Sequence, residues 1–404
     1  MDGQPGRLAI LVRALDGGGM QRNTMRLAGA FAARGHAVDV LAADVSGPMR
    51  RDIESVARLV ALAGGSHVGG RLLALRAGWR ERAELRPLLL GGGPGILAYL
   101  PALVAYLRST GPVALLALGT QCNLAALWAR RLAGTGSRIV VSERNTLSLV
   151  VANTRRRFRR AYPALIARTY PEADGIVAVS RAVADDLART CNLGTRTITT
   201  IPNPVPDPKN GSDGALAASD PAHPWLGPDQ PPLILGVGRL NWQKDFATLL
   251  EAFALVRRRR PARLAILGEG EERQRLEALA RKLGIALDLV MPGFVDDPLA
   301  WMARARLLAL TSTQEGFGNV IVEALASGCP VVASDIPGGP REILEGGRYG
   351  SLAPPGDAAA FAEAIQVVLD DPPAPALLAR RAEDYALGPI AGRYLALLLD
   401  KEPE

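Results

Sequence analysis

The feature that most constrains the fold is a repeated alternation between short apolar runs and segments with the composition of helices. In the first half, such runs occupy residues 7–12, 36–42, 113–118, 138–141, 175–179 and 197–201. In the second half, they occupy residues 233–237, 263–267, 286–290, 307–310, 330–333 and 350–352. Short apolar runs are typical of strands buried on both faces, and strands that alternate with helices form parallel sheets. The sequence therefore predicts an α/β protein with two doubly wound, Rossmann-like domains that face each other across a cleft.

The best boundary between the two domains is a segment rich in proline, glycine and polar residues at 206–231, which can sustain neither helix nor sheet. We expect an N-terminal domain at 1–205, a linker at 206–231 and a C-terminal domain at 232–385. A length of 404 residues suits two domains of this size. Ligands of such sheets bind beyond the carboxyl ends of the strands, so the loops that follow the apolar runs are the places to search for a site.

Cysteine and histidine are too few for several functional classes. The three cysteines, Cys122, Cys191 and Cys329, are far apart, which argues against a disulfide framework and a cysteine-based zinc site. The three histidines show no metal-ligand spacing. We therefore expect no bound metal.

The net charge of +7 hides a difference between the two halves. Residues 1–200 hold 27 arginines, no lysine and 13 acidic residues, whereas residues 201–404 hold 20 basic and 27 acidic residues. A basic half suits a polyanion, a phosphorylated substrate or an anionic membrane, although a generally arginine-rich composition would explain it as well. Five arginines lie within 155–160, which is consistent with either anionic headgroups or an ordinary solvated helix face.

Two apolar segments before residue 108 lack the pattern of a leader or of a membrane span. Leu8–Val12 is too short for a signal peptide. Residues 87–107 carry no charge, but glycines and prolines interrupt them, so a continuous spanning helix is poorly supported. We expect a loop followed by a helix at 96–108 that packs in the core or lies on a bilayer surface. The expected location is the cytoplasm, peripheral on the inner face of the membrane.

The sharpest motif runs from Glu315 to Ala324, after a buried strand and into a helix. Glycines let the backbone approach a ligand, and N–H groups at a helix N-terminus bind anions. Glu315 and Glu323 would flank a phosphate and accept hydrogen bonds from hydroxyls on either side of it, the layout of a nucleoside diphosphate sugar. The alternative is an acidic loop that caps the helix. The predicted donor-binding residues in this motif are Gly316, Phe317, Gly318, Asn319, Val320 and Glu323.

Two further motifs follow the first strand of each half. Arg239 and Lys244 lie five residues apart in a glycine-containing turn. Two such cations could bind a diphosphate leaving group. The alternative is that they are ordinary surface charges. Asp16 precedes three glycines that would let a phosphate or a sugar come close, although a tight turn explains them too. Gly18 and Gly19 are candidate donor-binding residues on this basis.

Together these strings resemble the glycosyltransferase family 4 (GT4) of retaining enzymes. The resemblance covers nearly the full chain and includes Val-Gly-Arg-Leu-x-x-x-Lys at 237–244, Glu-Gly-Phe-Gly…Glu-Ala at 315–324 and Gly-Gly-Pro-Arg-Glu-Ile-Leu at 338–344. It also includes Pro-Gly-Phe-Val at 292–295, Ala-Ser-Gly-Cys-Pro-Val-Val-Ala-Ser-Asp at 326–335 and Ile-Pro-Asn-Pro at 201–204.

The resemblance implies a GT-B fold in which the first domain holds an acceptor and the second a nucleotide sugar, with residues 386–404 packed back onto the first domain. In this family, Glu315 would bind the transferred sugar, Glu323 the ribose, and the backbone near Phe294 the base. Arg239 and Lys244 would neutralise the diphosphate, with Glu315 as the third catalytic residue. Many relatives place a histidine in a first-domain loop that here reads Glu143-Arg144-Asn145. These three residues and Asp16 are candidates for the acceptor side.

The predicted activity is a retaining transfer of a hexose or N-acetylhexosamine from a nucleotide sugar, UDP-linked, to a glycan or lipid-linked acceptor in cell-surface polysaccharide synthesis. No Asp-x-Asp motif occurs, so we expect transfer without a metal and without a cofactor. Partners other than these substrates and an anionic membrane are not expected, and no motif indicates nucleic-acid binding. The alternatives are a GT-B epimerase or phosphorylase and a sugar-binding protein without activity.

Overall fold

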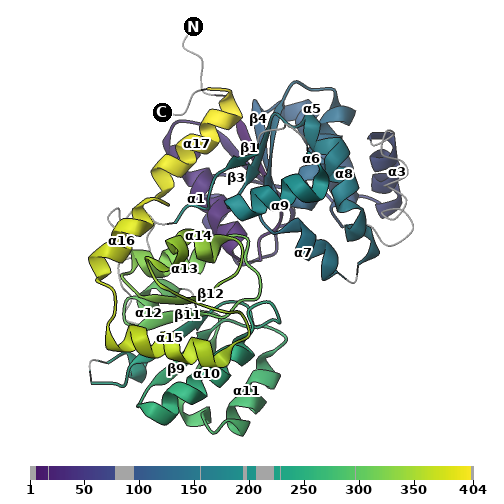
Figure 1. The fold of residues 1–404 in the computed structure, drawn as a ribbon. Helices are drawn as coiled ribbons and strands as arrows, with labels where there is room; N and C mark the ends of the chain where they lie inside the picture. The colour runs from purple at the N-terminus through teal and green to yellow at the C-terminus, as the bar shows by residue number, and fades with distance from the viewer. Residues whose placement is uncertain are drawn as a thin grey trace. The chain divides into compact units, whose positions relative to one another are not determined.

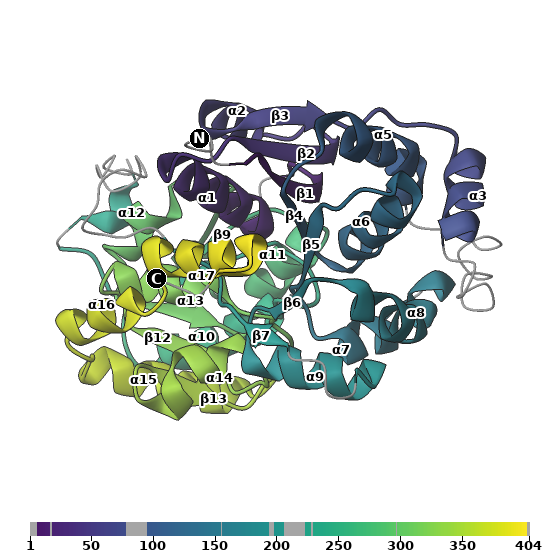
Figure 2. The same ribbon diagram turned by 90° about the horizontal axis from the view of Figure 1, so that it is seen from above.

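A computed structural model describes residues 6–16, 18–77, 95–154, 156–193, 198–205, 223–227, 229–295 and 297–401. The chain divides into two compact units, unit 1 (Met1–Pro204 with Leu387–Glu404) and unit 2 (Val205–Ala386). Most of the predicted linker, residues 206–222 and 228, lies outside the described residues. Each unit is a parallel sheet covered by helices (Figures 1 and 2).

The sheet of unit 1 is fully parallel and has the order β3-β2-β1-β4-β5-β6-β7. Its strands are β1 (Leu8–Ala14), β2 (Val38–Asp44), β3 (Arg58–Ala61), β4 (Ala114–Leu118), β5 (Arg138–Glu143), β6 (Gly175–Ala178) and β7 (Thr199–Thr200). All five residues of β4 are buried, as expected of a strand covered on both faces.

Helices cover both faces of this sheet. The longer ones are α1 (Gly19–Ala33), α2 (Arg50–Val56), α3 (His67–Ala77), α5 (Leu100–Thr110), α6 (Thr120–Ala133), α7 (Leu147–Ala152), α8 (Tyr162–Thr169), α9 (Arg181–Cys191) and α17 (Leu387–Leu399). Single turns are η2 (Gly95–Tyr99), η3 (Arg157–Ala161) and η4 (Tyr170–Glu172). Helices α5, α6 and α8 share one core with the sheet, and α17 packs on α1, β4 and β5.

Unit 2 repeats this architecture with a six-stranded parallel sheet of order β10-β9-β8-β11-β12-β13. The strands are β8 (Leu233–Val237), β9 (Arg263–Leu267), β10 (Leu289–Gly293), β11 (Leu307–Leu310), β12 (Val331–Ser334) and β13 (Ser351–Ala353). The helices are α10 (Phe246–Arg259), α11 (Arg273–Lys282), α12 (Pro298–Met302), α13 (Asn319–Ala326), α14 (Gly339–Ile343), α15 (Ala358–Asp370) and α16 (Pro375–Glu383). The single turns are η6 (Pro224–Leu226), η7 (Ala286–Asp288) and η8 (Glu345–Gly347).

Strand order identifies one special position in each sheet. In unit 1 the chain runs outward from β1 to β2 and β3, then returns to β4 on the other side of β1. In unit 2 it runs outward from β8 to β9 and β10, then returns to β11. At such a switch point the two loops beyond the central strands diverge and leave room for a ligand. The sites to examine are therefore the loops that follow β1 and β4, and those that follow β8 and β11.

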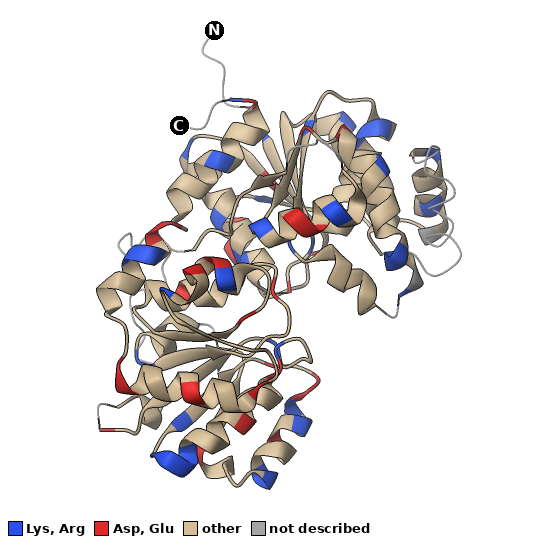
Figure 3. Cartoon of the chain, in the orientation of Figure 1, with Lys and Arg blue, Asp and Glu red and all other residues tan. Residues whose placement is uncertain are grey.

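The prediction of a doubly wound parallel sheet in each half is confirmed. The structure also shows one strand that the sequence did not indicate and the position of the apolar helix. Strand β3 was not anticipated, because it is a short edge strand that begins with Arg58 and is only partly buried. The apolar helix expected at 96–108 corresponds to η2 and α5, and its residues Leu100, Leu103 and Leu107 lie in the core. Within the described residues, no helix is long and apolar enough to cross a bilayer. Most charged residues lie on helices and loops (Figure 3), and those on the strands, such as Arg58 and Glu143, lie mainly at strand ends.

Candidate nucleotide-sugar site

The loop that follows β8 is ordered by hydrogen bonds of its own. Oδ1 of Asn241 accepts a hydrogen bond from the backbone N–H of Lys244 at 3.3 Å, which closes a short turn. Asp245 then adopts a left-handed conformation and caps α10, where its Oδ2 lies 2.6 Å from Oγ1 of Thr248. The direction of Lys244 is therefore fixed on both sides by polar residues that form a turn and a helix cap.

The loop that follows β11 is attached to the β8 loop across the switch point. Oγ1 of Thr311 lies 3.0 Å from the carbonyl oxygen of Lys244, and the N–H of Thr313 donates to the carbonyl oxygen of Gln243 at 2.8 Å. These hydrogen bonds pair backbone groups of each loop with groups of the other loop. The two loops therefore form one continuous surface at the carboxyl edge of the sheet.

Lys244 and Glu315 meet on this surface. Nζ of Lys244 donates to Oε1 of Glu315, and the same oxygen accepts a hydrogen bond from Oγ of Ser312 at 2.8 Å. The side chains of Lys244 and Glu315 are 21% and 15% exposed, so the pair is accessible to a ligand although it is largely shielded from water. The structure thus brings together a cation and a carboxylate that the sequence separates by 71 positions.

Two glycine positions allow the backbone to come close around Glu315. Gly318 precedes α13 with a φ of 93°, which residues with a side chain rarely adopt. A Cβ placed on Gly339 would lie 1.4 Å from the carbonyl oxygen of Phe317, so only glycine fits there. The loop that follows β12 therefore packs directly against the segment that carries Glu315.

The remaining predicted residues of unit 2 lie around this pair. The side chain of Arg239 is exposed and forms no ion pair with Glu315 within the described residues. Glu323 is 6% exposed on α13, one turn beyond Asn319, and Phe317 and Val320 are buried. Phe294 directly follows β10 and is 57% exposed. Gly316 is half-buried.

The glycine loop of unit 1 connects β1 to α1. Asp16 is exposed, accepts a hydrogen bond from Nε2 of Gln21, and lies 3.6 Å from Nη2 of Arg13. Gly18 caps α1, and Gly19 is its exposed first residue. Gly17 lies outside the described residues. The loop thus opens a helix at the switch point of unit 1, as the sequence predicts.

Glu143 ends β5 and belongs to a buried polar cluster. Its carboxylate accepts hydrogen bonds from Oγ1 of Thr120 at 2.9 Å, from Nδ2 of Asn123 at 3.1 Å and from the hydroxyl of Tyr170. Burial raises the pKa of this carboxyl above its ordinary value, although these hydrogen bonds and nearby Arg144 oppose the shift. Burial and the neighbouring Glu143 also raise the pKa of Tyr170.

The two residues that follow Glu143 differ in exposure. Arg144 is buried, and its Nη1 donates to Oδ1 of Asn203. Asn145 is exposed. Glu143 and Arg144 both form hydrogen bonds to other side chains of unit 1, so they stabilise the loop at the carboxyl end of β5. Asn145 is exposed and could contact a ligand. Direct contact of Glu143 or Arg144 with an acceptor stays a prediction.

Sequence reasoning missed the residues that join the two loops of unit 2. Thr311, Ser312 and Thr313 directly follow β11, and each forms a hydrogen bond to the β8 loop or to Glu315. Three hydroxyl residues after a buried strand are a recognisable pattern of short polar side chains that tie down a loop. The described residues contain no group of three or more His, Cys, Asp or Glu side chains placed to hold a metal ion.

Known families match both parts of the chain. Residues 223–385 match the family described as glycosyl transferases group 1, and residues 17–207 match glycosyltransferase family 4. Each unit therefore matches a glycosyltransferase family, in agreement with the resemblance found in the sequence. The family match in unit 2 includes Lys244, Glu315 and the loops that join them.

Two curated relatives illustrate the family. The N-acetylgalactosamine-N,N'-diacetylbacillosaminyl-diphospho-undecaprenol 4-alpha-N-acetylgalactosaminyltransferase of Campylobacter jejuni is 31% identical over 62% of this chain and 65% of its own length. The lipopolysaccharide core biosynthesis glycosyltransferase LpsE of Rhizobium meliloti is 35% identical over 43% of this chain and 52% of its own length. The chain thus matches about half to two thirds of the length of these relatives.

Solved structures show the same fold over nearly the whole chain. The sucrose-phosphate synthase of Thermosynechococcus elongatus has a TM-score of 0.74 at 20% identity and covers 98% of both chains. Anabaena HepE in complex with UDP-glucose has a TM-score of 0.73 at 19% identity and covers 98% of this chain and 100% of its own. The predicted GT-B fold is confirmed by these neighbours.

Proposed function

We propose that this protein is a retaining glycosyltransferase that moves a hexose or N-acetylhexosamine from a UDP-sugar to a glycan or lipid-linked acceptor in cell-surface polysaccharide or glycoconjugate synthesis. The observation that carries the proposal is the contact between Lys244 and Glu315 at the switch point of unit 2. A cation beside a carboxylate, with exposed Arg239 on the same loop, suits a ligand that joins a diphosphate to a sugar.

Each of these groups has a chemical role in the proposal. Departure of a nucleoside diphosphate leaves negative charge on its phosphate oxygens, and Lys244 and Arg239 would stabilise that charge. Backbone N–H groups at the start of α13 would add to this stabilisation. Glu315 would accept hydrogen bonds from hydroxyls of the transferred sugar, and Glu323 from the ribose. With these groups, the transfer needs no metal ion and no cofactor.

Retention would follow from attack on the face from which the diphosphate departs, with the leaving phosphate accepting the proton of the acceptor hydroxyl. The alternative is a covalent intermediate on Glu315. Hydrogen bonds from Lys244 and Ser312 to the same oxygen of Glu315 stabilise its charge and make it a weaker nucleophile. This geometry favours attack on the same face.

The comparisons support particular substrates within the proposal. A neighbour in fold was solved with UDP-glucose, which favours UDP as the nucleotide. The Campylobacter jejuni relative is named for a diphospho-undecaprenol acceptor, which favours a lipid-linked acceptor. The arginine cluster at 155–160 would then contact anionic headgroups on the inner face of the membrane, and its members Arg156 and Arg160 are exposed. Arg155 lies outside the described residues.

A thermal-shift comparison of UDP, GDP and ADP tests the nucleotide. A ligand that binds only the folded protein stabilises it by ~2.7 kcal/mol at about one hundred times its Kd, which raises Tm by several degrees. We expect UDP to raise Tm more than GDP and ADP do. If no nucleotide changes Tm but a free hexose does, the protein is a sugar-binding protein without a nucleotide donor.

Product analysis separates transfer from the other enzymatic alternatives. With a UDP-sugar labelled in the hexose and a lipid-linked diphosphate acceptor, a transferase moves the label to the acceptor with the anomeric configuration kept. An epimerase would return the label as a different UDP-sugar, and a phosphorylase would need inorganic phosphate. Either of these two results would contradict the proposal.

A further inference from the structure

Two residues near the end of unit 2 contact the elements that hold the predicted sugar-binding segment. Arg381 lies in the last turn of α16, and its side chain is 12% exposed. Tyr385 lies two residues beyond α16 and is 8% exposed. Helix α16 packs on α13, which begins directly after the segment that carries Glu315. Neither residue belongs to a motif of the nucleotide-sugar site, so any role in that site has to follow from their contacts.

Arg381 holds the end of the neighbouring helix α14. Its Nε donates to the carbonyl oxygen of Ile343 at 2.8 Å, and its Nη2 donates to that of Glu342 at 2.9 Å. Carbonyl groups in the last turn of a helix ordinarily lack a partner within the helix, and the planar fork of a guanidinium can satisfy two of them. Arg381 also forms ion pairs with Glu345 at 3.0 Å and with Asp384 at 2.7 Å. These contacts fix the guanidinium against α14.

Tyr385 connects this arginine to the segment that carries Glu315. Its hydroxyl accepts a hydrogen bond from Nη2 of Arg381 at 2.9 Å. Its ring packs against Phe317 in a T-shaped arrangement with 5.5 Å between the ring centres. Phe317 lies two residues after Glu315 and is buried. The backbone of Tyr385 is fixed as well, because its carbonyl oxygen accepts a hydrogen bond from the N–H of Val205 at 3.1 Å.

The start of α14 leaves no space beside the same segment. A Cβ on Gly338 would lie 2.5 Å from the carbonyl oxygen of Glu315, and one on Gly339 would lie 1.4 Å from that of Phe317. Because the two stretches of backbone are in contact, a shift of α14 must also move the segment from Glu315 to Phe317. The position of Glu315 therefore depends on whatever fixes α14 and the ring of Phe317.

We propose that Arg381 and Tyr385 are positioning residues for the sugar part of the donor. This inference rests on the proposed function, in which Glu315 accepts hydrogen bonds from the transferred sugar. Arg381 fixes α14 and Tyr385 fixes Phe317, so together they determine where the carboxylate of Glu315 lies. The nucleotide part depends on the β8 loop, which its own turn and helix cap fix. Loss of Arg381 or Tyr385 should therefore affect the sugar and spare the nucleotide.

Hydrogen exchange followed by mass spectrometry on the full chain without ligand tests the positioning. In Arg381→Met, amides of residues 315–319 should exchange roughly tenfold faster, the factor expected when two hydrogen bonds from a charged group are lost. Arg257→Met is the matched control, because Arg257 also binds a carboxylate, Asp288 at 2.8 Å, and a carbonyl, that of Arg260 at 3.3 Å. Asp288 precedes β10 and lies at the amino edge of the sheet, so this variant should leave residues 315–319 unchanged. Wild-type exchange of these amides in Arg381→Met would overturn the proposal.

A comparison of two substitutions at Tyr385 separates the sugar from the nucleotide. The probes are UDP alone, UDP-glucose and UDP-N-acetylglucosamine. Tyr385→Leu removes the ring from Phe317, so release of UDP from the sugar donor that the wild type uses should fall about tenfold or more, because a misplaced carboxylate no longer meets the sugar. The Kd of UDP alone should not change. Tyr385→Phe keeps the ring and should keep most of the wild-type turnover.

The outcomes distinguish this inference from the proposed function. Loss of UDP affinity together with turnover in Tyr385→Leu would overturn the inference in favour of a general structural role, and so would equal turnover in Tyr385→Leu and Tyr385→Phe. A cooperative thermal transition of each variant shows that it is folded. A wild type that binds no UDP would instead contradict the proposed function. The exchange comparison needs no donor, so it tests the contacts of Arg381 in either case.

Discussion

Lys244 is one of four lysines in the chain, and its position explains why a flexible point charge is useful there. The ammonium donates to Glu315 from a loop that is fixed at Asn241 and Thr311. A lysine can keep this contact and still turn another of its three N–H groups toward an incoming phosphate, because it has no planar fork to satisfy.

Lys244→Ala should lower turnover by about a hundredfold, the order of magnitude seen when one partner of a transition-state charge is lost. The measurement is the rate of sugar release from the identified nucleotide sugar, with an acceptor present. Lys282→Ala is the matched control, because Lys282 is exposed at the end of α11 and lies outside the site. Turnover that is unchanged in Lys244→Ala would show that this lysine does not serve the leaving group.

Glu143 makes a testable contribution to stability as a function of pH. Its pKa is raised in the folded protein, so the folded state holds this proton more tightly than the unfolded state does. Its contribution to stability is therefore present below its ordinary pKa of 4.5 and is lost as the pH rises through the folded pKa. The neighbouring Cys122 and Cys191, whose pKa values burial raises to about 12, stay protonated over this range.

Glu143→Gln should consequently gain stability relative to the wild type as the pH rises from acidic to neutral. The amide can keep the hydrogen bonds to Tyr170 and Thr120 but cannot ionise. Urea unfolding of both proteins at several pH values measures the difference. A difference that stays constant with pH would mean that the carboxyl titrates alike in the folded and unfolded states.

At the level of helices and strands, the residue at which a helix begins depends on side chains that are close to it in the sequence. Ser180 directly follows the apolar run at 175–179, a position where serine favours the start of a helix, and in the structure it caps α9. Its hydroxyl accepts a hydrogen bond from the N–H of Val183 at 3.3 Å. Asp357 caps α15 in the same way through the N–H of Ala360 at 2.9 Å. Such contacts join residues only three apart, so they can be read without the tertiary structure.

Ser180→Ala should destabilise unit 1 by about 1 kcal/mol, because the first turn of α9 loses an acceptor in a buried setting. Chemical unfolding followed by circular dichroism measures the change. Ser109→Ala, at an exposed position in the last turn of α5, serves as the control and should change stability by no more than about 0.5 kcal/mol. An equal effect at both positions would contradict a capping role for Ser180.

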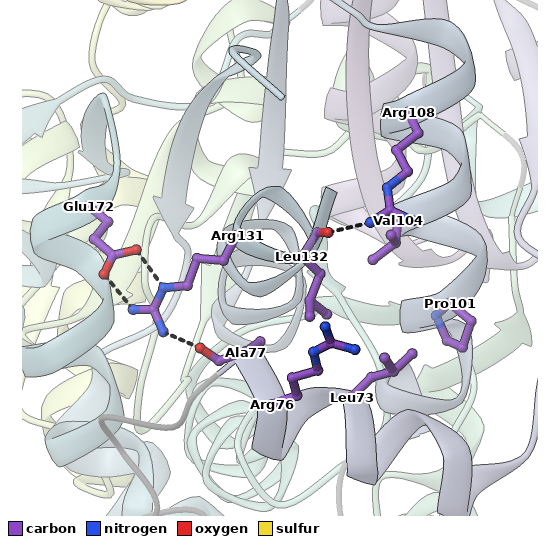
Figure 4. A pocket seen from close by; sticks show the side chains of 9 residues that line it. All are labelled: Leu73, Arg76, Ala77, Pro101, Val104, Arg108, Arg131, Leu132 and Glu172. Atoms are coloured by element: carbon purple, nitrogen blue, oxygen red, sulfur yellow. Dashed lines mark hydrogen bonds and ion pairs between the residues drawn. The ribbon is translucent and has the colours of Figure 1, made fainter. Parts of the chain in front are cut away.

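In the molecule as a whole, the two units have the same sheet architecture but differ in net charge. The arginine excess of residues 1–200 belongs to unit 1, and the acidic excess of residues 201–404 falls mainly on unit 2. In unit 1, three of the arginines, Arg76, Arg108 and Arg131, line an open cavity between α3, α5 and α6 (Figure 4). In unit 2, Lys244 and Glu315 concentrate opposite charges at the switch point. The two units thus differ in charge although they share one architecture.

The fold class, most strands, the cap at Ser180 and the motifs around Lys244 and Glu315 can be predicted from the amino-acid sequence. These features depend on short-range patterns: apolar runs, glycine spacing and the preference of serine for a helix start. The sequence does not indicate β3, whose edge position leaves it partly exposed, because a partly buried strand lacks the apolar run that marks the others.

Contacts between groups that are distant in the sequence depend on the tertiary structure. The contact of Lys244 with Glu315 spans 71 positions and exists because β8 and β11 are neighbours, which strand order alone decides. The burial of Glu143 depends likewise on Tyr170 and Asn123, which reach it from other elements. The cavity beside Arg76 requires three helices to pack in one arrangement. Local patterns carry no information about such contacts, because their free energy comes from groups that become neighbours only when the sheet forms.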